Sequence, residues 1–174
     1  MPIAVLMDFV ARRPRTVLLG LALWCVALLL FGLYLQHAQG LEPCPMCIVQ
    51  RYALMGVAVL ALALAAGRGV QWHRWGSLAV VLVAGFGAVT AARQSWLQWF
   101  PPEVYSCGRD FYGMIESFPL RRAIPMIFRG SGDCTQIDWT FLGLSIANWS
   151  FLNFIAMAVV AIVLWVALGR RRPA

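Results

Sequence analysis

The sequence predicts an all-α membrane protein, a bundle of four transmembrane helices with two loops on one side of the membrane. Of its 174 residues, 61% are apolar and 12% are charged, whereas soluble domains carry about 25% charged residues. The mean hydropathy is +0.76. A helix needs about 20 apolar residues to cross about 30 Å of hydrocarbon. We predict spans over residues 16–35, 47–66, 75–96 and 149–169.

Each predicted span is rich in Leu, Ala and Val, and Arg51 and Arg93 are the only charged residues in them. A soluble helix would interrupt such a run with a polar face at every turn. The first span could instead be a signal peptide, because arginines precede it and small residues at 38–40 are spaced like a cleavage site. Signal-peptide cores run about 7–15 residues, so its length favours a transmembrane helix.

The composition also excludes other classes of protein. Intrinsic disorder requires low hydrophobicity, which this chain lacks. The net charge of +7 comes from fourteen arginines and seven acidic residues, with no lysine. Because the arginines gather at the ends of the apolar runs, they indicate membrane topology and not nucleic-acid binding.

The distribution of charge predicts the orientation. The tails 1–15 and 170–174 and the link 67–74 hold eight arginines and one acidic residue. The loops 36–46 and 97–148 hold four arginines against six acidic residues. The positive-inside rule then places both termini in the cytoplasm. In a bacterial inner membrane the two loops face the periplasm, where disulfides form and persist.

The second loop, over residues 97–148, is long for a compact domain, and such loops usually carry function or are disordered. Its many aromatic and aliphatic residues argue against disorder. We weigh two arrangements of residues 110–128 evenly. They form a short helix lying on the membrane surface, or their aromatic side chains pack on the ends of the bundle as an interfacial belt. Pro119 and Pro125 would interrupt a helix there.

Four of the five cysteines lie in or beside the loops, two in each: Cys44 with Cys47, and Cys107 with Cys134. This even distribution favours pairing. Cys25, in the middle of the first span, is predicted to be a small apolar filler of the core.

Cys44 and Cys47 form a Cys-Pro-Met-Cys motif. Two cysteines at this spacing close a small, strained ring that exchanges readily. Pro45 restricts the backbone between them. Cys47 stands where the second helix is predicted to begin, and the first N–H groups of a helix favour a thiolate. A structural disulfide, half of a zinc site and chance are the alternatives. The second pair lacks this spacing, which disfavours zinc.

Arg51 follows Cys47 by one helical turn, so the two share a face, with the arginine about 6 Å deeper. A charge at the hydrocarbon boundary costs free energy, so it either snorkels to the interface or has a partner. Beside a thiol it could stabilise a thiolate and donate to a carbonyl oxygen of a membrane quinone. A quinone accepts the two electrons that a dithiol gives up.

Cys107 and Cys134 have two interpretations. A disulfide between them would close a large loop and stabilise the fold by about 3–4 kcal/mol in the chain-entropy model. The glycine-rich stretch 130–134 is flexible, which instead suits a cysteine that moves between partners. Both interpretations stay open at this point.

With these motifs the chain resembles the DsbB family, inner-membrane oxidases that regenerate the periplasmic thiol oxidase DsbA. The resemblance covers residues 15–168. It rests on Cys44-Pro45-Met46-Cys47 with Gln50-Arg51, Leu97-Gln98 before Pro101, Cys107, and Ser131-Gly132-Asp133-Cys134 followed by Trp139 and Phe141-Leu142-Gly143-Leu144.

The resemblance implies a role for each site residue. Cys107 would be attacked by the thiol of reduced DsbA, and Cys134 would be its partner in the oxidised state, which then exchanges with Cys44. Cys47 would contact a non-covalently bound quinone, ubiquinone or menaquinone, and Arg51 would hold it. Electrons would run from DsbA through the two cysteine pairs to the quinone.

One position departs from the family pattern. Some members carry a histidine where this chain has Gln94, beside Arg93, so a role assigned to that histidine does not carry over. Thermodynamics supports the quinone. DsbA is a strong oxidant near about −120 mV, and an isolated unstrained disulfide, typically below about −300 mV, could not oxidise it.

The sequence therefore predicts a membrane thiol–disulfide oxidoreductase that supports disulfide formation in exported proteins. Two alternatives remain. A vitamin K epoxide reductase-like quinone reductase would share the four-helix bundle, but its Cys-x-x-Cys lies toward the C-terminal end, whereas here the motif opens the second helix. A structural four-span protein would use its disulfides only to staple its loops. We expect neither a metal site nor nucleic-acid binding.

Overall fold

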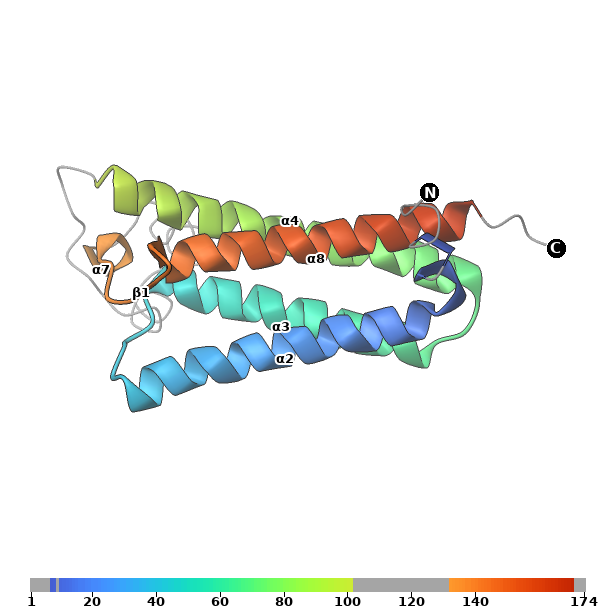
Figure 1. Ribbon diagram of the computed structural model, residues 1–174, viewed down its shortest axis with the longest axis horizontal. Coiled ribbons are helices and arrows are strands. Elements are labelled where there is room, and N and C mark those ends of the chain that lie inside the picture. The colour runs from blue at the N-terminus through green and yellow to red at the C-terminus, as the bar shows by residue number, and fades with distance from the viewer. Residues whose placement is uncertain (1–6, 9, 102–131, 171–174) are drawn as a thin grey trace, which may run out of the picture.

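Four long helices run side by side along one axis (Figure 1). The computed structural model of the chain describes residues 7, 8, 10–101 and 132–170. In this part, four helices are long and apolar enough to cross a membrane, which confirms the predicted fold class. They are α2 (Pro14–Ala38), α3 (Pro45–Ala66), α4 (Val70–Trp99) and α8 (Ile146–Gly169).

The helices extend beyond the predicted spans. Helix α2 continues past residue 35 to Ala38, and α4 begins at Val70 instead of residue 75 and ends at Trp99. The spans were predicted from hydrocarbon thickness, whereas a helix can continue into the headgroup region while its own hydrogen bonds satisfy the backbone. The link between α3 and α4 is therefore only residues 67–69.

Local sequence explains where the helices begin. Pro14 and Pro45 occupy the first helical positions of α2 and α3, where the missing N–H costs nothing and the fixed φ suits the helix. Ser145 caps α8, because its Oγ accepts the N–H of Asn148 at 3.4 Å.

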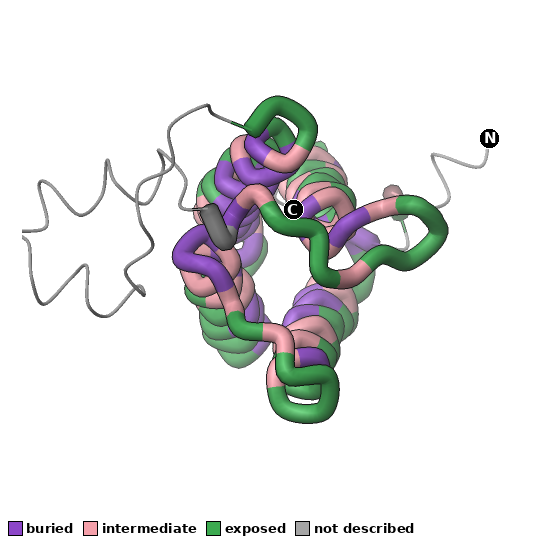
Figure 2. Tube along the Cα trace, turned by 90° about the vertical axis from the view of Figure 1, so that its left-hand side faces the viewer, coloured by how far each residue is buried: buried purple, intermediate pink, exposed green. Residues whose placement is uncertain are grey.

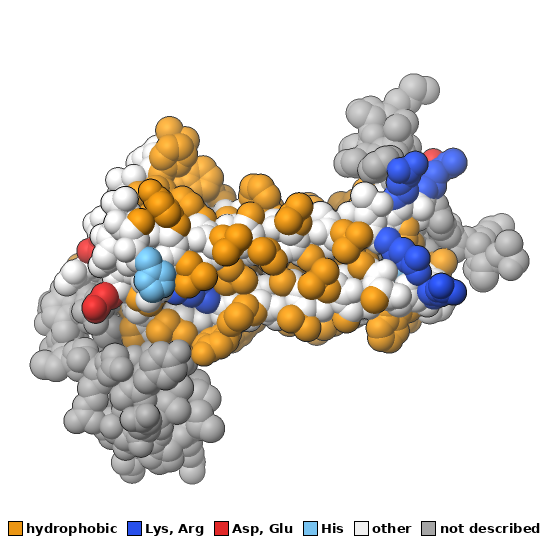
Figure 3. Space-filling model, turned by 90° about the horizontal axis from the view of Figure 1, so that it is seen from below, with side chains coloured by type: hydrophobic (Ala, Val, Ile, Leu, Met, Phe, Trp, Pro, Cys, Tyr) orange, Lys and Arg blue, Asp and Glu red, His pale blue; other side chains and the backbone are white. Residues whose placement is uncertain are grey.

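The helices pack in a series, α2 on α3, α3 on α4 and α4 on α8. Buried residues lie on the faces that the helices turn to one another (Figure 2). Small residues allow close approach: Gly87 of α4 lies against the ring of Phe154 on α8, where a Cβ would overlap that ring. Large apolar side chains cover the outer faces (Figure 3), as expected of helices exposed to lipid.

Small elements join α4 to α8 at one end of the bundle (Figure 1). Helix α7 (Gly132–Thr135) packs on α4. Strands β1 (Thr140–Phe141) and β2 (Leu144–Ser145) pair antiparallel.

The turn of this hairpin has two residues, Leu142 with φ 52° and Gly143 with φ 78°. Two positive φ values match the right-handed twist of the strands in a two-residue hairpin. The indole Nε1 of Trp149 donates to the carbonyl of Phe141 at 3.0 Å. The hairpin is thereby fixed to the first turn of α8.

Cys107 and the predicted interfacial segment 110–128 lie outside the described residues. The two alternatives for that segment stay predictions.

Candidate active site

The start of α3 brings two sulfur atoms together. Cys44 is the N-cap residue of α3, and its sulfur accepts the backbone N–H of Cys47 at 3.3 Å. The two Sγ atoms are 2.7 Å apart. We predicted that this helix begins at Cys47, but it begins two residues earlier, at Pro45, so the capping sulfur belongs to Cys44.

A third cysteine joins this pair. Cys134 of α7 is buried in a small cluster with Cys44, Met46 and Leu97. Hydrogen bonding with Cys134 and with Cys47, together with burial, raises the pKa of the Cys44 thiol above its ordinary value. The described chain thus places three of the four predicted cysteines, Cys44, Cys47 and Cys134, at one site.

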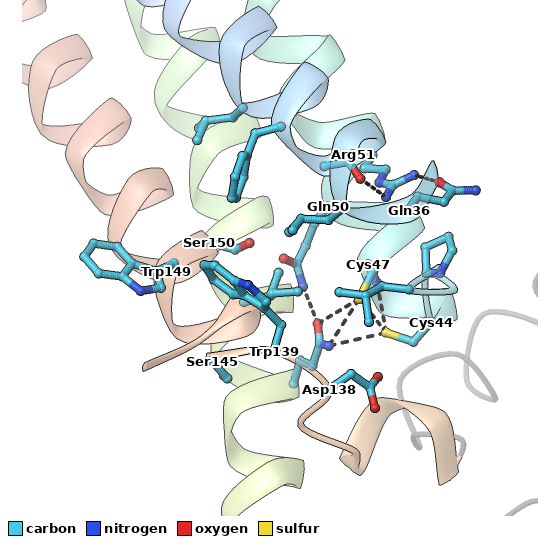
Figure 4. A pocket seen from close by; sticks show the side chains of 18 of the residues that line it. Gln36, Cys44, Cys47, Gln50, Arg51, Asp138, Trp139, Ser145, Trp149 and Ser150 are labelled. Atoms are coloured by element: carbon cyan, nitrogen blue, oxygen red, sulfur yellow. Dashed lines mark hydrogen bonds between the residues drawn. The ribbon is translucent and has the colours of Figure 1, made fainter. Parts of the chain in front are cut away.

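Two glutamines lie beside the sulfurs: Gln94 contacts them, and Gln50, labelled in Figure 4, contacts Gln94. Gln94, buried in α4, has its Nε2 at 3.3 Å from the sulfurs of both Cys44 and Cys47. Its Oε1 accepts the amide N–H of buried Gln50 at 2.7 Å. The thiol of Cys47 also donates to this oxygen, at 3.7 Å, so the oxygen of Gln94 is shared by Gln50 and Cys47 while its amide nitrogen faces both sulfurs. This orientation offers a hydrogen-bond donor to whichever sulfur is ionised.

From the sequence, Gln94 stands out only as a departure from a family pattern, and Gln50 has no role of its own. A polar side chain inside an apolar span is a signal for a functional site in a membrane protein. That signal could have selected both glutamines. It could not have shown that they meet. Gln94, and not its neighbour Arg93, lines the cavity beside the sulfurs.

Arg51 is half-buried and turns toward α2. Its Nη1 donates to Oε1 of Gln36 at 2.7 Å, and its Nη2 donates to the carbonyl of Gly32 at 3.2 Å (Figure 4). Within the described chain its hydrogen bonds go to α2 and none goes to Cys47. The amide of Gln94, and not the guanidinium of Arg51, contacts the sulfur of Cys47, and the support of a Cys47 thiolate by Arg51 stays a prediction.

A cavity of about 410 Å³ lies beside the sulfurs and is bordered by all four long helices. Cys47, Gln50 and Arg51 of α3 line one side of it, and Trp139 and Trp149 line the side opposite (Figure 4). Ligand cavities are typically about 300–1,000 Å³, mostly apolar with a few placed polar groups. This cavity has both properties.

The opposite wall is a row of aromatic rings. Trp139 meets the ring of Phe31 edge-on at 5.9 Å between centroids and stacks on Phe141 at 6.1 Å. Phe141 in turn lies 6.0 Å from the ring of Trp149. Trp139 thus bridges from the hairpin at α8 to Phe31 on α2. Flat aromatic faces beside an arginine suit a flat ring that carries carbonyl oxygens.

Gln98 anchors the segment that carries Trp139. The hydroxyl of Ser145 donates to Oε1 of Gln98 at 2.6 Å, and Nε2 of Gln98 donates to the carbonyl of Gln136 at 3.3 Å. These bonds hold the segment between α7 and α8 against α4.

Within the described chain, no group of three His, Cys, Asp or Glu residues is arranged to hold a metal ion.

Comparison with known proteins identifies the family. The model of the family "Disulfide bond formation protein DsbB" matches residues 14–164. The chain belongs to the DsbB family. The match covers α3, α4 and α7, and so includes the residues described above as contacting the sulfurs.

Curated DsbB relatives cover nearly the whole chain. A disulfide bond formation protein B of Polaromonas sp. (strain JS666 / ATCC BAA-500) is 70% identical over 161 residues, 91% of this chain and 95% of the relative. The protein of that name from Paracidovorax citrulli (strain AAC00-1) is 65% identical over 169 residues, 96% and 94% of the two chains. That of Acidovorax sp. (strain JS42) is 63% identical over 169 residues, 97% of each.

The expectation from the sequence motifs is therefore confirmed at the level of the DsbB family. The chain is a multi-pass membrane protein of disulfide bond formation, a disulfide-forming oxidoreductase. This membership replaces the vitamin K epoxide reductase-like and purely structural alternatives.

Proposed function

We propose that this protein reoxidises a DsbA-like periplasmic thiol oxidase and transfers the electrons to a membrane quinone. One observation carries the proposal: the sulfurs of Cys44 and Cys47, 2.7 Å apart, adjoin an aromatic-lined cavity of about 410 Å³ that also contains Arg51. Cys134 is hydrogen-bonded to Cys44 and buried in one cluster with it. The pair therefore adjoins both a third thiol and an apolar cavity.

The residues of the cavity fit a quinone ring. A guanidinium has five N–H donors, and Gln36 and Gly32 accept two of the donors of Arg51. The donors that remain can bond to a ring carbonyl, a charge-assisted hydrogen bond of the stronger class. Phe31, Trp139 and Trp149 supply flat apolar faces. When bound, a quinone would supply a sink for two electrons and two protons.

Thiol exchange carries the electrons to Cys44. A thiolate of reduced DsbA attacks Cys107, so the Cys107–Cys134 disulfide breaks, a mixed disulfide forms and Cys134 is released as a thiolate. The second DsbA thiol resolves the mixed disulfide, which leaves DsbA oxidised and Cys107 reduced. Cys134 then attacks Cys44 of the Cys44–Cys47 disulfide. The hydrogen bond between Cys134 and Cys44 supports this transfer.

The attack on Cys44 releases Cys47 as a thiolate. The amide nitrogen of Gln94, 3.3 Å from both sulfurs, stabilises that charge. Cys107 displaces Cys44 from Cys134 and restores the first disulfide. Cys44 and Cys47 then re-form their own disulfide as two electrons pass to the acceptor. The sum is one DsbA dithiol oxidised per quinone reduced, with both thiol protons passing to the product.

We also propose that the protein lies in the bacterial inner membrane with both termini in the cytoplasm. Arginine side chains gather at one end of the molecule (Figure 3), where Arg12, Arg13, Arg15 and Arg68 line a common cavity, whereas α7 and the start of α3 lie at the opposite end (Figure 1). We call these the arginine end and the cysteine end. The positive-inside rule supports a cytoplasmic arginine end and a periplasmic cysteine end.

The first test mixes purified protein, reduced DsbA and a soluble ubiquinone analogue without oxygen. We expect quinone absorbance to fall until one quinone is reduced per DsbA dithiol. Cys107→Ser should stop turnover and give no mixed disulfide with DsbA on acid quenching and gel analysis. Full recovery of that complex from Cys107→Ser, or oxidation of DsbA without loss of quinone, would contradict the proposal.

A further inference from the structure

The arginine end contains a second cavity, of about 580 Å³. It lies between the first turns of α2 and α4 and Leu168, the next-to-last residue of α8. Four arginines from two segments of the chain line it, and its apolar lining includes Val70 and Leu168. The arginines are Arg12, Arg13, Arg15 and Arg68.

Two helix N-termini face this cavity. Helix α2 follows Arg13 and α4 follows Gly69, and in the part of the chain that the structure describes neither N-cap residue bonds the first turn through its side chain. Neither first turn contains an acidic residue. The free N–H groups and the positive ends of both helix dipoles favour an anion.

His73 gives an independent indication of a ligand. It lines the cavity and is only 4% exposed. Its Nδ1 lies 2.7 Å from the carbonyl of Gly69, and since a carbonyl only accepts, Nδ1 carries the hydrogen. Its Nε2 is buried and has no partner among the described residues. In the neutral ring this atom is an acceptor, and an unpaired buried acceptor costs free energy that a ligand hydroxyl would recover.

The arginines are only partly satisfied by the protein. Arg12 pairs with Asp8 at 2.7 Å on the exposed surface, and Arg15 donates to the carbonyl of Gly67 at 2.9 Å. Arg13 and Arg68 are exposed, and neither has an ion pair within the described chain. These two side chains are therefore the ones available to a phosphate.

We propose that this cavity binds the headgroup of an anionic phospholipid that carries both a phosphate and a hydroxyl, as phosphatidylglycerol does. Arg13 and Arg68 hold the phosphate, and Nε2 of His73 accepts the hydroxyl. A lipid is the source because the cavity lies at headgroup depth. Trp72 and Trp75, in the first two turns of α4, are 52% and 58% exposed, as expected of an interfacial aromatic belt.

The test is native mass spectrometry of the full-length protein from micelles that contain equal amounts of phosphatidylglycerol and phosphatidylcholine. We expect the wild type to retain phosphatidylglycerol preferentially. Arg13→Gln with Arg68→Gln should weaken that retention about thirtyfold, since each arginine near a charged surface contributes about 1 kcal/mol. The matched control, Arg93→Gln with Arg170→Gln, removes the same charge from positions that do not line the cavity and should retain the lipid.

Two further arms complete the test. His73→Phe, which leaves the arginines in place, should reduce the preference for phosphatidylglycerol over phosphatidylcholine. If the double arginine variant is not recovered, Arg68→Gln alone replaces it in the test. Inorganic phosphate at millimolar concentration should not displace the lipid, whereas displacement would indicate a site for soluble phosphate and overturn the lipid assignment. Equal retention by the wild type and the cavity variants, or equal loss in the control pair, would also overturn it.

Discussion

Two buried sulfur environments in this protein differ in what surrounds the thiol. Cys25, in the middle of α2, is fully buried in the main hydrophobic core, and the thioether of Met157 lies 3.8 Å from its sulfur. At the cysteine end, Cys44 and Cys47 meet a backbone N–H, the amide of Gln94 and a cavity. Under the proposed function only the second environment is reactive, because a reactive thiol needs polar donors, a second sulfur and access to an acceptor in addition to its place in the fold.

Replacing a sulfur at the cysteine end should have the largest effect. Cys47→Ser and Cys44→Ser should each lower quinone reduction by reduced DsbA more than about a thousandfold, because the electron carrier is removed. Anaerobic quinone absorbance measures this. Cys25→Ser, the matched change in the core, should keep more than half of the rate. Near-normal turnover in purified Cys47→Ser would contradict the proposed difference between the core sulfur and the sulfurs at the cysteine end.

Removing the positive charge of Arg51 from the cavity should have the second-largest effect. Arg51→Ala removes a charge-assisted hydrogen bond of about 1.5–3 kcal/mol, so the apparent KM for quinone should rise about 10- to 100-fold. Steady-state kinetics at varied quinone concentration test this. Arg93→Ala, a half-buried arginine outside the cavity, should leave the KM unchanged. An unchanged KM in Arg51→Ala would place the acceptor elsewhere.

The amide support of the sulfurs should have a smaller effect. Gln94→Leu removes two donor contacts to sulfur, each worth about 0.5–1.5 kcal/mol, and should slow quinone reduction about tenfold. Alkylation of the reduced protein across pH should also shift to higher pH at Cys47, a change that a purely structural role would not produce. Ser95→Ala is the matched control, since Ser95 is buried beside Gln94 and its Oγ has no partner in the described residues.

The smallest effect belongs to the core sulfur. Cys25→Ala should cost about 1 kcal/mol of unfolding free energy by leaving a small void against Met157. Thermal unfolding in detergent measures it, with quinone reduction as the second readout. A loss of activity greater than the loss of folded protein would show that Cys25 takes part in the chemistry.

Much of the architecture follows from local sequence. Each predicted span lies within one of the four long helices, because an apolar run of about 20 residues with at most one charge has few alternatives to a membrane helix. The proximity of Cys44 and Cys47 follows from their spacing at a helix start. Helix ends were less predictable, since α4 continues beyond hydrocarbon thickness at both ends.

Contacts between helices could not be predicted. The bond between Gln94 and the sulfur of Cys44 spans fifty residues, and it depends on which face of α4 packs against α3. Periodicity placed Arg51 on the face of Cys47, but the packing of α2 on α3 turned its guanidinium to Gln36. The distribution of arginines along the sequence predicted which end of the bundle is positive. The cavity at that end depends on the packing of the starts of α2 and α4 and could not be predicted.

The account depends most on direct electron transfer from the Cys44–Cys47 pair to a quinone. The most direct measurement adds one equivalent of a ubiquinone analogue, without oxygen and without DsbA, to protein whose thiols are fully reduced. Quinone absorbance and the alkylation of each cysteine by mass are then followed together. We predict that the quinone is consumed while Cys44 and Cys47 become protected. Unchanged quinone with both thiols still open to alkylation would contradict the account.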